Sequence, residues 1–222
     1  MYFENLAMLG NYAPFFLKGV WTTIWLSAVC LALATVTGLV VGTLHQLAWK
    51  PVRALITVYI HLVRGTPFLV QLFIIFFLLP ELVGLELSPI PSALVALLIH
   101  GTAYIAAIFS AGVASIPKGQ WEATAAQGLS LMQTLRHVAF PQIFQFVLPP
   151  LVGQYVLLIK DTTVVSIVGV TELTKSGLLI ASRIPEGVTI FSVIGVFYFL
   201  ICYPLVHLAN RLEQRFTPTA GN

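Results

Sequence analysis

Three consecutive polar residues, Lys160, Asp161 and Thr162, have the types and spacing to recognise a small charged molecule. They follow an apolar run at residues 137–159, and ionisable side chains at membrane depth usually face a protein interior because burial in lipid is unfavourable. A lysine and an aspartate complement the two charges of a zwitterion. A mutual Lys160–Asp161 ion pair is the alternative, but adjacent helical residues diverge by about 100°, which strains it.

Further polar groups interrupt other apolar runs. Arg64 precedes Gly65-Thr66-Pro67, a sequence that can loosen a helix and expose backbone groups. Arg64 and Thr66 are therefore candidates to line a pathway, although an arginine can also extend to the membrane face or pair inside a bundle. His100 and Tyr104 share a face at i, i+4 spacing, where an interhelical hydrogen bond is the simpler expectation and a pathway role for Tyr104 is the alternative.

The elements that position these groups must be membrane helices. The chain has 222 residues, of which 58% are hydrophobic and 9% charged, whereas a soluble domain carries about 25% charged residues. The net charge of +3 gives no argument for nucleic acid. The two cysteines lie in apolar runs without metal-ligand or disulfide spacing, so we expect neither a metal site nor a disulfide framework.

Five segments are long and apolar enough to cross a membrane, since a spanning helix needs about 20 apolar residues. We expect an all-α membrane protein, with one transmembrane domain over residues 1–222 and spans at residues 20–44, 54–80, 87–117, 137–159 and 187–210. The first span is expected to be retained rather than cleaved. Pro141, Pro149 and Pro150 are expected to bend or break the fourth. Residues 160–186 predict one or two short re-entrant or interfacial helices.

The distribution of charge predicts the orientation of these helices. Five spans place the termini on opposite sides, and lysine and arginine accumulate on the cytoplasmic side. We therefore expect the N-terminus outside, the C-terminus in the cytoplasm and a cytoplasmic loop at residues 117–136. The side with more bases carries Lys50, Arg53, Lys118, Arg136, Arg211 and Arg215 with Glu122 and Glu213; the other carries Lys18, Lys175 and Arg183 with Glu4, Glu81, Glu86, Glu172 and Glu186.

Residues 116–142 form the longest water-compatible helical stretch. Pro117 can open a helix at its first turn, and Glu122 is early enough to complement the helix dipole. Gly128 can end that helix in the left-handed conformation, and Ser130 with Gln133 matches a capping box that starts a second helix. The stretch therefore predicts two short helices around a glycine break, which is more structure than a plain connecting loop needs.

This stretch resembles the E-A-A loop of permease subunits of bacterial ATP-binding-cassette (ABC) importers. The family pattern is E-A-A, then Gly, then I-x-L-P. Here Glu122-Ala123 and Gly128 match, Thr124 replaces the third-position Ala, and V-A-F-P at residues 138–141 replaces I-x-L-P. In that family the loop is a coupling helix that seats in a cleft on the ATPase subunit. The resemblance thus implies the type I importer permease fold.

The resemblance extends over nearly the whole chain. Within the family, the sequence is similar to the polar amino-acid uptake subfamily. The matching blocks are R-G-T-P-F-L-V-Q-L-F at residues 64–73, A-Y-I-A at 103–106, S-I-P-K-G-Q-W-E-A at 115–123, F-P-Q-x(6)-L-P-P-L at 140–151 and I-K-D-T-T-V-V-S-I-V-G-V-T-E-L at 159–173. The subfamily often has an acid after A-Y-x-A and an arginine three residues later. Ala107 and Ser110 occupy those positions, so we expect a different substrate preference or a site on a partner permease.

The resemblance implies an importer of a polar amino acid, glutamine-like, acidic or basic, that moves it from periplasm to cytoplasm across the bacterial inner membrane. It implies two cytoplasmic ATPase subunits that bind Mg-ATP, no cofactor on this chain, a second identical or paralogous permease, and a periplasmic or lipid-anchored amino-acid-binding protein. The residues expected to couple to the ATPase are Gly119, Glu122, Ala123, Ala126, Gly128, Leu129 and Ser130. The candidates for the substrate pathway are Arg64, Thr66, Tyr104, Lys160, Asp161 and Thr162.

Other function classes fit the sequence less well. The chain has no G-x-x-x-x-G-K-[ST] sequence, so it cannot hold ATP by a P-loop, and we find no catalytic cluster or nucleophile elbow. We therefore do not expect an enzyme. An ion-coupled secondary carrier is the alternative, because it would explain Lys160 and Asp161 and would transport without nucleotide. It would leave the two helices around Gly128 without a role.

Overall fold

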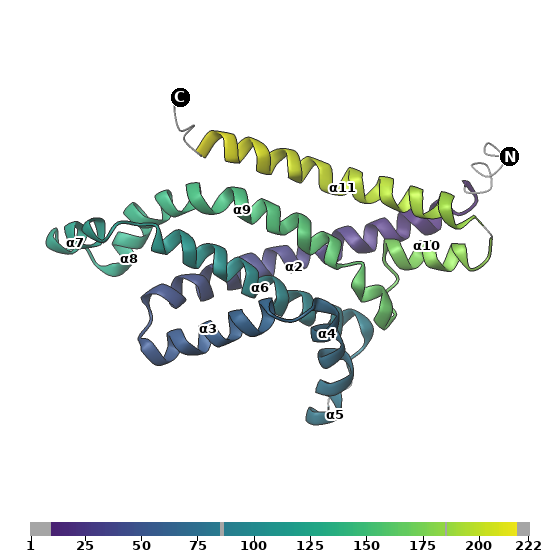
Figure 1. The fold of residues 1–222 in the computed structure, drawn as a ribbon, viewed down its shortest axis with the longest axis horizontal. Coiled ribbons are helices and arrows are strands. Elements are labelled where there is room, and N and C mark those ends of the chain that lie inside the picture. Colours follow the sequence, from purple (N-terminus) through teal and green to yellow (C-terminus); the bar gives the residue numbers. More distant parts are fainter. Residues whose placement is uncertain (1–9, 85–86, 185, 217–222) are drawn as a thin grey trace.

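The computed structural model describes residues 10–84, 87–184 and 186–216, and the regular elements in these ranges are all helical (Figure 1). Four helices are long and apolar enough to cross a membrane: α2 (Ala13–Leu47), α6 (Pro89–Ala114), the stretch Leu131–Val168 that contains α9 (Phe140–Asp161), and α11 (Gly187–Phe216). A bent pair of helices makes a fifth candidate. The predicted all-α membrane fold with about five spans is confirmed. Glu4 and Glu86 lie outside the described residues.

The second expected span is not one helix. α3 (Lys50–Arg64) ends before Pro67, and the chain continues as α4 (Phe68–Phe73), a π-helical turn η1 (Ile74–Leu78) and α5 (Leu79–Val83). The two halves are bent by 106°. Proline causes the break because it has no N–H to donate and disfavours the helical conformation at the residue before it. α4 still packs against α6, with Leu72 fully buried, whereas α5 projects away from the bundle (Figure 1).

α2 and α6 form the centre of the bundle because glycines let their backbones approach closely. A Cβ atom on Gly38 would overlap the side chain of Ile105, and one on Gly42 would overlap the carbonyl oxygen of Ala106. Small residues at such positions are the usual way to pack membrane helices, where water supplies no driving force between them. Leu26 and Cys30 of α2, fully buried, join α4 and α6 in the main core cluster.

The prolines of the fourth span do not break it. α9 runs from Phe140 to Asp161 as one helix with Pro149 and Pro150 inside it. Pro141 lies in the first turn, where a helix needs no N–H partner. The two missing interior donors are tolerated, as in other membrane helices, because neighbouring groups can satisfy the freed carbonyls. The expected break at residues 149–150 is therefore wrong, whereas the alternative, a bend there, stays a prediction.

Two short helices fill the region between α9 and α11, as the sequence predicted. The 3₁₀ helix η3 (Val164–Val168) ends at Gly169, whose φ is +98°, and α10 (Leu173–Ala181) follows. Glu172 is fully buried and caps α10 by accepting the N–H groups of Thr174 at 2.8 Å and Lys175 at 2.7 Å. The Tyr198 hydroxyl of α11 donates to the same carboxylate at 2.8 Å, which fastens α10 to α11.

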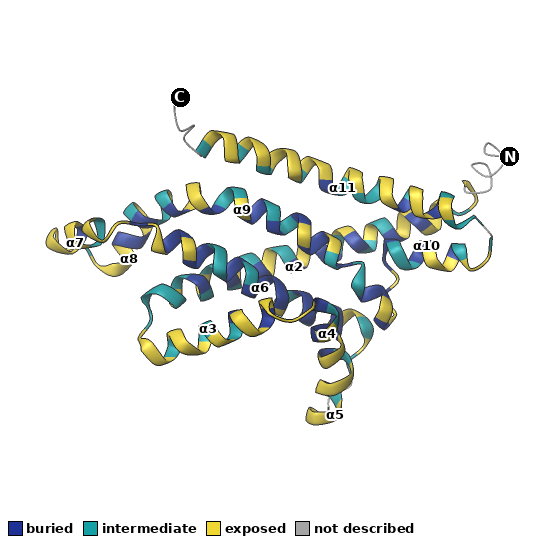
Figure 2. Cartoon of the chain, in the orientation of Figure 1, coloured by how far each residue is buried: buried dark blue, intermediate teal, exposed yellow. Residues whose placement is uncertain are grey.

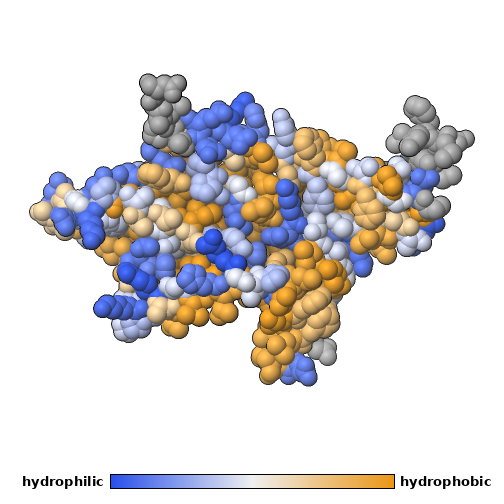
Figure 3. Space-filling model, in the orientation of Figure 1, coloured by the Kyte–Doolittle hydropathy of each residue, from blue (hydrophilic) through white to orange (hydrophobic). Residues whose placement is uncertain are grey.

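Apolar side chains cover much of the outer surface. Large hydrophobic residues are exposed on α2, η1 and α11, among them Trp21, Phe77 and Phe199. α5 and α11 are largely exposed (Figure 2), and a continuous hydrophobic surface covers the α4–α5 region (Figure 3). Such extended apolar patches mark surfaces that contact lipid or another protein.

Candidate functional site

The predicted coupling segment forms one end of the molecule. α7 (Lys118–Ala126) and α8 (Leu131–Thr134) lie opposite the end that holds α10 and the start of α2 (Figure 1). Gly128 has a φ of +75°, its N–H donates to the Ala125 carbonyl at 3.0 Å, and the Leu129 N–H donates to Thr124 at 3.1 Å. These two bonds complete a Schellman motif, so the predicted glycine break is confirmed.

The capping box that starts α8 is also present. The Gln133 N–H donates to the Ser130 hydroxyl at 3.3 Å, and the Ser130 N–H donates to the Gln133 side chain at 2.8 Å. Two details of α7 differ from expectation. Pro117 is the N-cap rather than the first helical residue, and Glu122 lies beyond the first turn, which contains no acid. Glu122 therefore does not complement the helix dipole, whose effect is confined to that turn.

The coupling segment presents a mixed surface to its surroundings. Glu122, Ala123 and Ala126 are exposed, and so are Leu131 and Met132, with 55% and 71% of their surface accessible. Thr124, which replaces the third alanine of the family pattern, is buried, with 7% of its surface accessible. Its hydroxyl donates to the Trp121 carbonyl at 3.0 Å. The replacement faces inward, so it leaves the outer face of α7 unchanged.

The coupling segment is fastened to α9 at its base. The π-helical turn η2 (Leu135–Ala139) joins α8 directly to α9, and Leu135 and Ala139 are buried in a core cluster with Ile143. The Gln142 side chain of α9 donates to the Gln120 side chain of α7 at 2.6 Å. A displacement of α7 and α8 would therefore be transmitted to α9, because both ends of the segment are attached to it.

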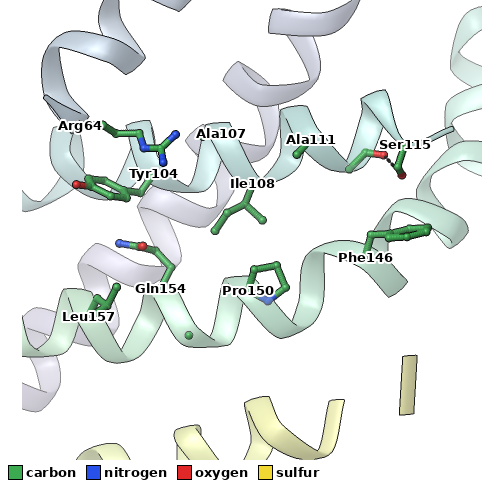
Figure 4. Close-up of a pocket in the computed structure, with 12 residues that line it drawn as sticks. Arg64, Tyr104, Ala107, Ile108, Ala111, Ser115, Phe146, Pro150, Gln154 and Leu157 are labelled. Atoms are coloured by element: carbon green, nitrogen blue, oxygen red, sulfur yellow. Dashed lines mark hydrogen bonds between the residues drawn. The ribbon is translucent and has the colours of Figure 1, made fainter. Parts of the chain in front are cut away.

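A cavity of about 610 Å³ lies between α6 and α9. Tyr104, Ile108 and Ala111 line it from α6, and Pro150, Gln154 and Leu157 line it from α9 (Figure 4). Arg64, at the end of α3, lies over the Tyr104 ring with 5.3 Å between the guanidinium carbon and the ring centroid. The Gln154 side chain points across the cavity towards Tyr104 (Figure 4). A cation, a phenol and an amide thus converge in a mostly apolar space, as in many small-molecule sites.

Lys160, Asp161 and Thr162, at the end of α9, have three different surroundings. Asp161 is about 30% exposed, one helical turn beyond Leu157, and its carboxylate lies 3.5 Å from His100 Nε2 of α6. Lys160 is exposed. Thr162 is fully buried and donates to the Ile159 carbonyl at 2.6 Å, which places it in the end of α9 rather than in the cavity.

Thr66 and the two positions that depart from the family pattern, Ala107 and Ser110, also have different surroundings, and only Ala107 lines the cavity. The Thr66 hydroxyl bonds to the Leu62 carbonyl at 2.8 Å and to Gln71, away from the cavity lining. Ala107 lines the cavity, whereas Ser110 is buried on the opposite side and contacts His45 at 2.7 Å. An acid at position 107 would therefore face the cavity, and an arginine at position 110 would not.

Sequence reasoning missed three polar residues in this region: Gln71, Gln154 and Glu172. Gln154 has helical spacing from Pro150, Leu157 and Asp161, so the pattern i, i+3, i+7 could have shown that it shares their face. Gln71 gave no such signal, because its partner His100 is 29 positions away. Glu172 gave a local signal that was not used, since an acidic residue directly before a helix can cap its first N–H groups. Within the described residues, no group of three His, Cys, Asp or Glu side chains could hold a metal ion.

Known proteins resemble this chain along nearly its full length. Residues 34–218 match the profile of a family described as binding-protein-dependent transport system inner membrane component. The glutamine transport system permease protein GlnP of Escherichia coli K12 is 37% identical over 203 residues, covering 91% of this chain and 93% of that protein. The L-cystine transport system permease protein TcyB of Bacillus subtilis 168 is 34% identical over 206 residues, covering 92% and 88%.

A solved structure shows the same architecture. In the crystal structure of an amino acid ABC transporter with histidines, one chain superposes with a TM-score of 0.83 and 28% sequence identity. The superposition covers 95% of this chain and 97% of that one. The helices that frame the cavity and the coupling segment are therefore part of a shared arrangement.

Proposed function

The chain belongs to the family of binding-protein-dependent transport system inner membrane components. We propose which of its parts couple to an ATPase and which form the passage for a polar amino acid. It is a multi-pass inner-membrane permease of an amino-acid ABC importer, and the ion-coupled carrier is the less supported alternative. As a transport permease it is not itself an enzyme, and importers of this kind act with an ATPase and a binding protein.

The observation that carries the proposal is the coupling segment. Its exposed face combines Glu122, small alanines and the apolar Leu131 and Met132, which suits insertion into a cleft on another protein. In the proposed cycle, two ATPase subunits bind Mg-ATP, and each binds the coupling segment of one of the two permeases. Gly119, Leu129 and Ser130 shape or cap it, and its attachment to α9 through Gln142 transmits the movement to the cavity wall.

The cavity between α6 and α9 serves as the substrate passage in this proposal. Arg64 faces the carboxylate of the amino acid, Tyr104 and Gln154 contact its polar atoms, and Asp161 binds its ammonium group at the outer end. Lys160 stands nearby on the same helix as a second charge. A second copy of the permease, or a paralogue, would face this wall to close the passage, since about five spans on one chain do not supply two symmetric halves.

The proposed orientation of the permease follows from the distribution of lysine and arginine. The N-terminal end and α10 face the periplasm, where a periplasmic or lipid-anchored binding protein delivers the substrate. The coupling segment and the C-terminal end of α11 face the cytoplasm. ATP binding opens the passage outward, and hydrolysis on the ATPase resets it.

The decisive experiment is purification of the protein from its native membrane, followed by mass spectrometry and uptake assays in proteoliposomes. We expect an ATPase with a Walker motif, with or without a second permease, and uptake of a polar amino acid that requires internal ATP. Glutamine is the first substrate to test, because the E. coli relative is a glutamine transport permease. Transport by this chain alone, without nucleotide, would overturn the proposal.

A further inference from the structure

A carbonyl group left without a donor by Pro67 fixes the orientation of the Gln71 amide. In a continuous helix the Val63 carbonyl would accept the N–H of residue 67, which proline lacks. Gln71 Nε2 donates to this carbonyl at 2.7 Å and to the Thr66 carbonyl at 3.0 Å. The opposite amide orientation would set an oxygen against two carbonyl oxygens, so the nitrogen must occupy this position.

The fixed amide in turn determines which nitrogen of His100 carries a proton. Gln71 Oε1 lies 3.0 Å from His100 Nδ1. An amide oxygen can only accept, so Nδ1 must be the donor. In a neutral imidazole the other nitrogen, Nε2, then has no proton and presents a lone pair.

That second nitrogen faces a carboxylate. His100 Nε2 lies 3.5 Å from Asp161 Oδ2, and the His100 side chain is 7% exposed. A lone pair opposite a negative charge is repulsive, and the burial of the ring limits how far water can screen this repulsion, although the Asp161 side chain is 30% exposed. A proton at this contact turns the repulsion into attraction, either as an imidazolium beside a carboxylate or as a neutral imidazole beside a carboxylic acid.

The surrounding groups leave Asp161 as the charged partner of His100. On its own helix His100 contacts the Tyr104 ring, with centroids 4.8 Å apart, and the guanidinium carbon of Arg64 of α3 lies 5.3 Å from the centroid of that same ring. α4 contributes Gln71 and the apolar Phe68, whose ring is 4.9 Å away. On α9, Lys160 is exposed and directly precedes Asp161, so the two side chains point about 100° apart around the helix.

We propose that His100 and Asp161 hold a single proton between them, and that this proton leaves when the ammonium group of an amino-acid substrate binds to Asp161. The second part rests on the substrate role of Asp161 proposed above. The ammonium replaces the proton as the partner of the carboxylate, His100 remains as the neutral ring protonated on Nδ1, and the released proton enters water in the cavity. The net charge of the site stays constant, which avoids burial of an additional charge. Gln71 is a positioning residue, because it acts by fixing the ring.

Nitrogen-15 NMR tests the shared proton directly. The permease is labelled at histidine, assembled with its ATPase in nanodiscs, and the His100 signals are assigned with His100→Asn. We expect Nδ1 to be protonated, with the shared proton either on Nε2 or on Asp161, where it gives a carboxylic-acid infrared band that Asp161→Asn removes. A neutral ring protonated on Nε2 would overturn the proposal, and so would a neutral ring beside an ionised Asp161.

Calorimetry with L-glutamine tests the release step. Binding to the assembled transporter is measured in buffers of different ionisation enthalpy, which reveals any proton released. Wild type should release a proton on binding. His100→Asn keeps an N–H for Gln71 but has no second nitrogen, so it should bind without release. His61→Asn, a change at an exposed histidine of α3, is the matched control and should behave as wild type.

The two parts of the proposal fail in different ways. Wild-type binding without proton release overturns the release step even if the NMR signature of the shared proton is present. Unchanged uptake of L-glutamine by Asp161→Asn overturns the substrate role of Asp161 and the release step with it. Absence of the NMR signature, with uptake still dependent on Asp161, overturns the shared proton and leaves the proposed substrate role standing.

Discussion

Neighbouring charges on α9 have different surroundings, and this difference is visible only in three dimensions. Asp161 approaches His100 of α6, whereas Lys160 is exposed. The divergence of adjacent helical residues explains the separation. The alternative, a mutual Lys160–Asp161 ion pair, is therefore absent from the described part of the chain.

We predict that Asp161→Ala reduces substrate uptake at least tenfold, which corresponds to about 1.4 kcal/mol of lost interaction. Lys160→Ala should reduce it less, because Lys160 lies away from the cavity lining. Both variants should still bind the ATPase, measured by co-purification, since the coupling segment is at the other end of α9. Equal uptake by wild type and both variants would remove residues 160–161 from the site.

The alanine at position 107 provides a second prediction, on selectivity. Ala107 lines the cavity that also contains Arg64. Ala107→Glu should raise the preference for basic over neutral amino acids by roughly tenfold, because one added charge contributes on the order of 1 kcal/mol at a partly hydrated site. Competition assays measure the preference, and Ala107→Gln, which has the same shape without the charge, should leave it unchanged.

Glu172 predicts a dependence of stability on pH. Burial raises the pKa of this carboxyl above its ordinary value of 4.5, although hydrogen bonds from Thr174, Lys175 and Tyr198 oppose the shift. A raised pKa means that the folded state holds the proton more tightly. The contribution to stability is therefore full below the unfolded pKa and declines as pH rises through the folded pKa.

Unfolding of the purified protein, followed in detergent across this pH range, measures the decline. Glu172→Gln should flatten it, because the amide does not titrate. A variant with the same slope as wild type would show that another group is responsible.

At the scale of elements, the coupling segment depends on one backbone conformation. Gly128 has a φ of +75°, and a Cβ atom there would meet nothing within 4 Å. Gly128→Leu should therefore cost only the left-handed penalty of about 1–2 kcal/mol, which is enough to re-orient α7 against α8. We expect lost coupling of ATP hydrolysis to transport with an intact membrane fold.

Circular dichroism checks the fold of this variant, and ATPase activity with and without substrate checks the coupling. Gly195→Ala is the matched control, because Gly195 lies inside α11 with open space around it. Coupling that survives Gly128→Leu would show that the left-handed turn is dispensable.

How far the sequence predicted these elements depended on whether their causes are local. The glycine break at residue 128 and the Ser130 cap were predictable, because turn and capping signals involve residues three or four apart. The continuity of α9 through Pro149 was not, since it depends on neighbouring helices. The contact of Asp161 with His100 joins residues 61 positions apart, so no local pattern could indicate it.

At the scale of the molecule, the predicted orientation can be measured by thiol labelling in intact cells. Ala125→Cys places an exposed thiol on the coupling segment, and Leu179→Cys places one on α10. The two native cysteines are buried and free, so their background should be low. An impermeant maleimide should label position 179 but not position 125. The reverse pattern would invert the topology.

The bend of 106° after α3 has a consequence for how the two halves of the bent pair are held in the membrane. α3 has 15 residues, which span about 22 Å at 1.5 Å per residue, whereas the hydrocarbon core is about 30 Å thick. Neither half of the bent pair can therefore settle across the bilayer as an independent helix. The two halves depend on each other and on the neighbouring α6, against which both α3 and α4 pack, to be stable in the bilayer.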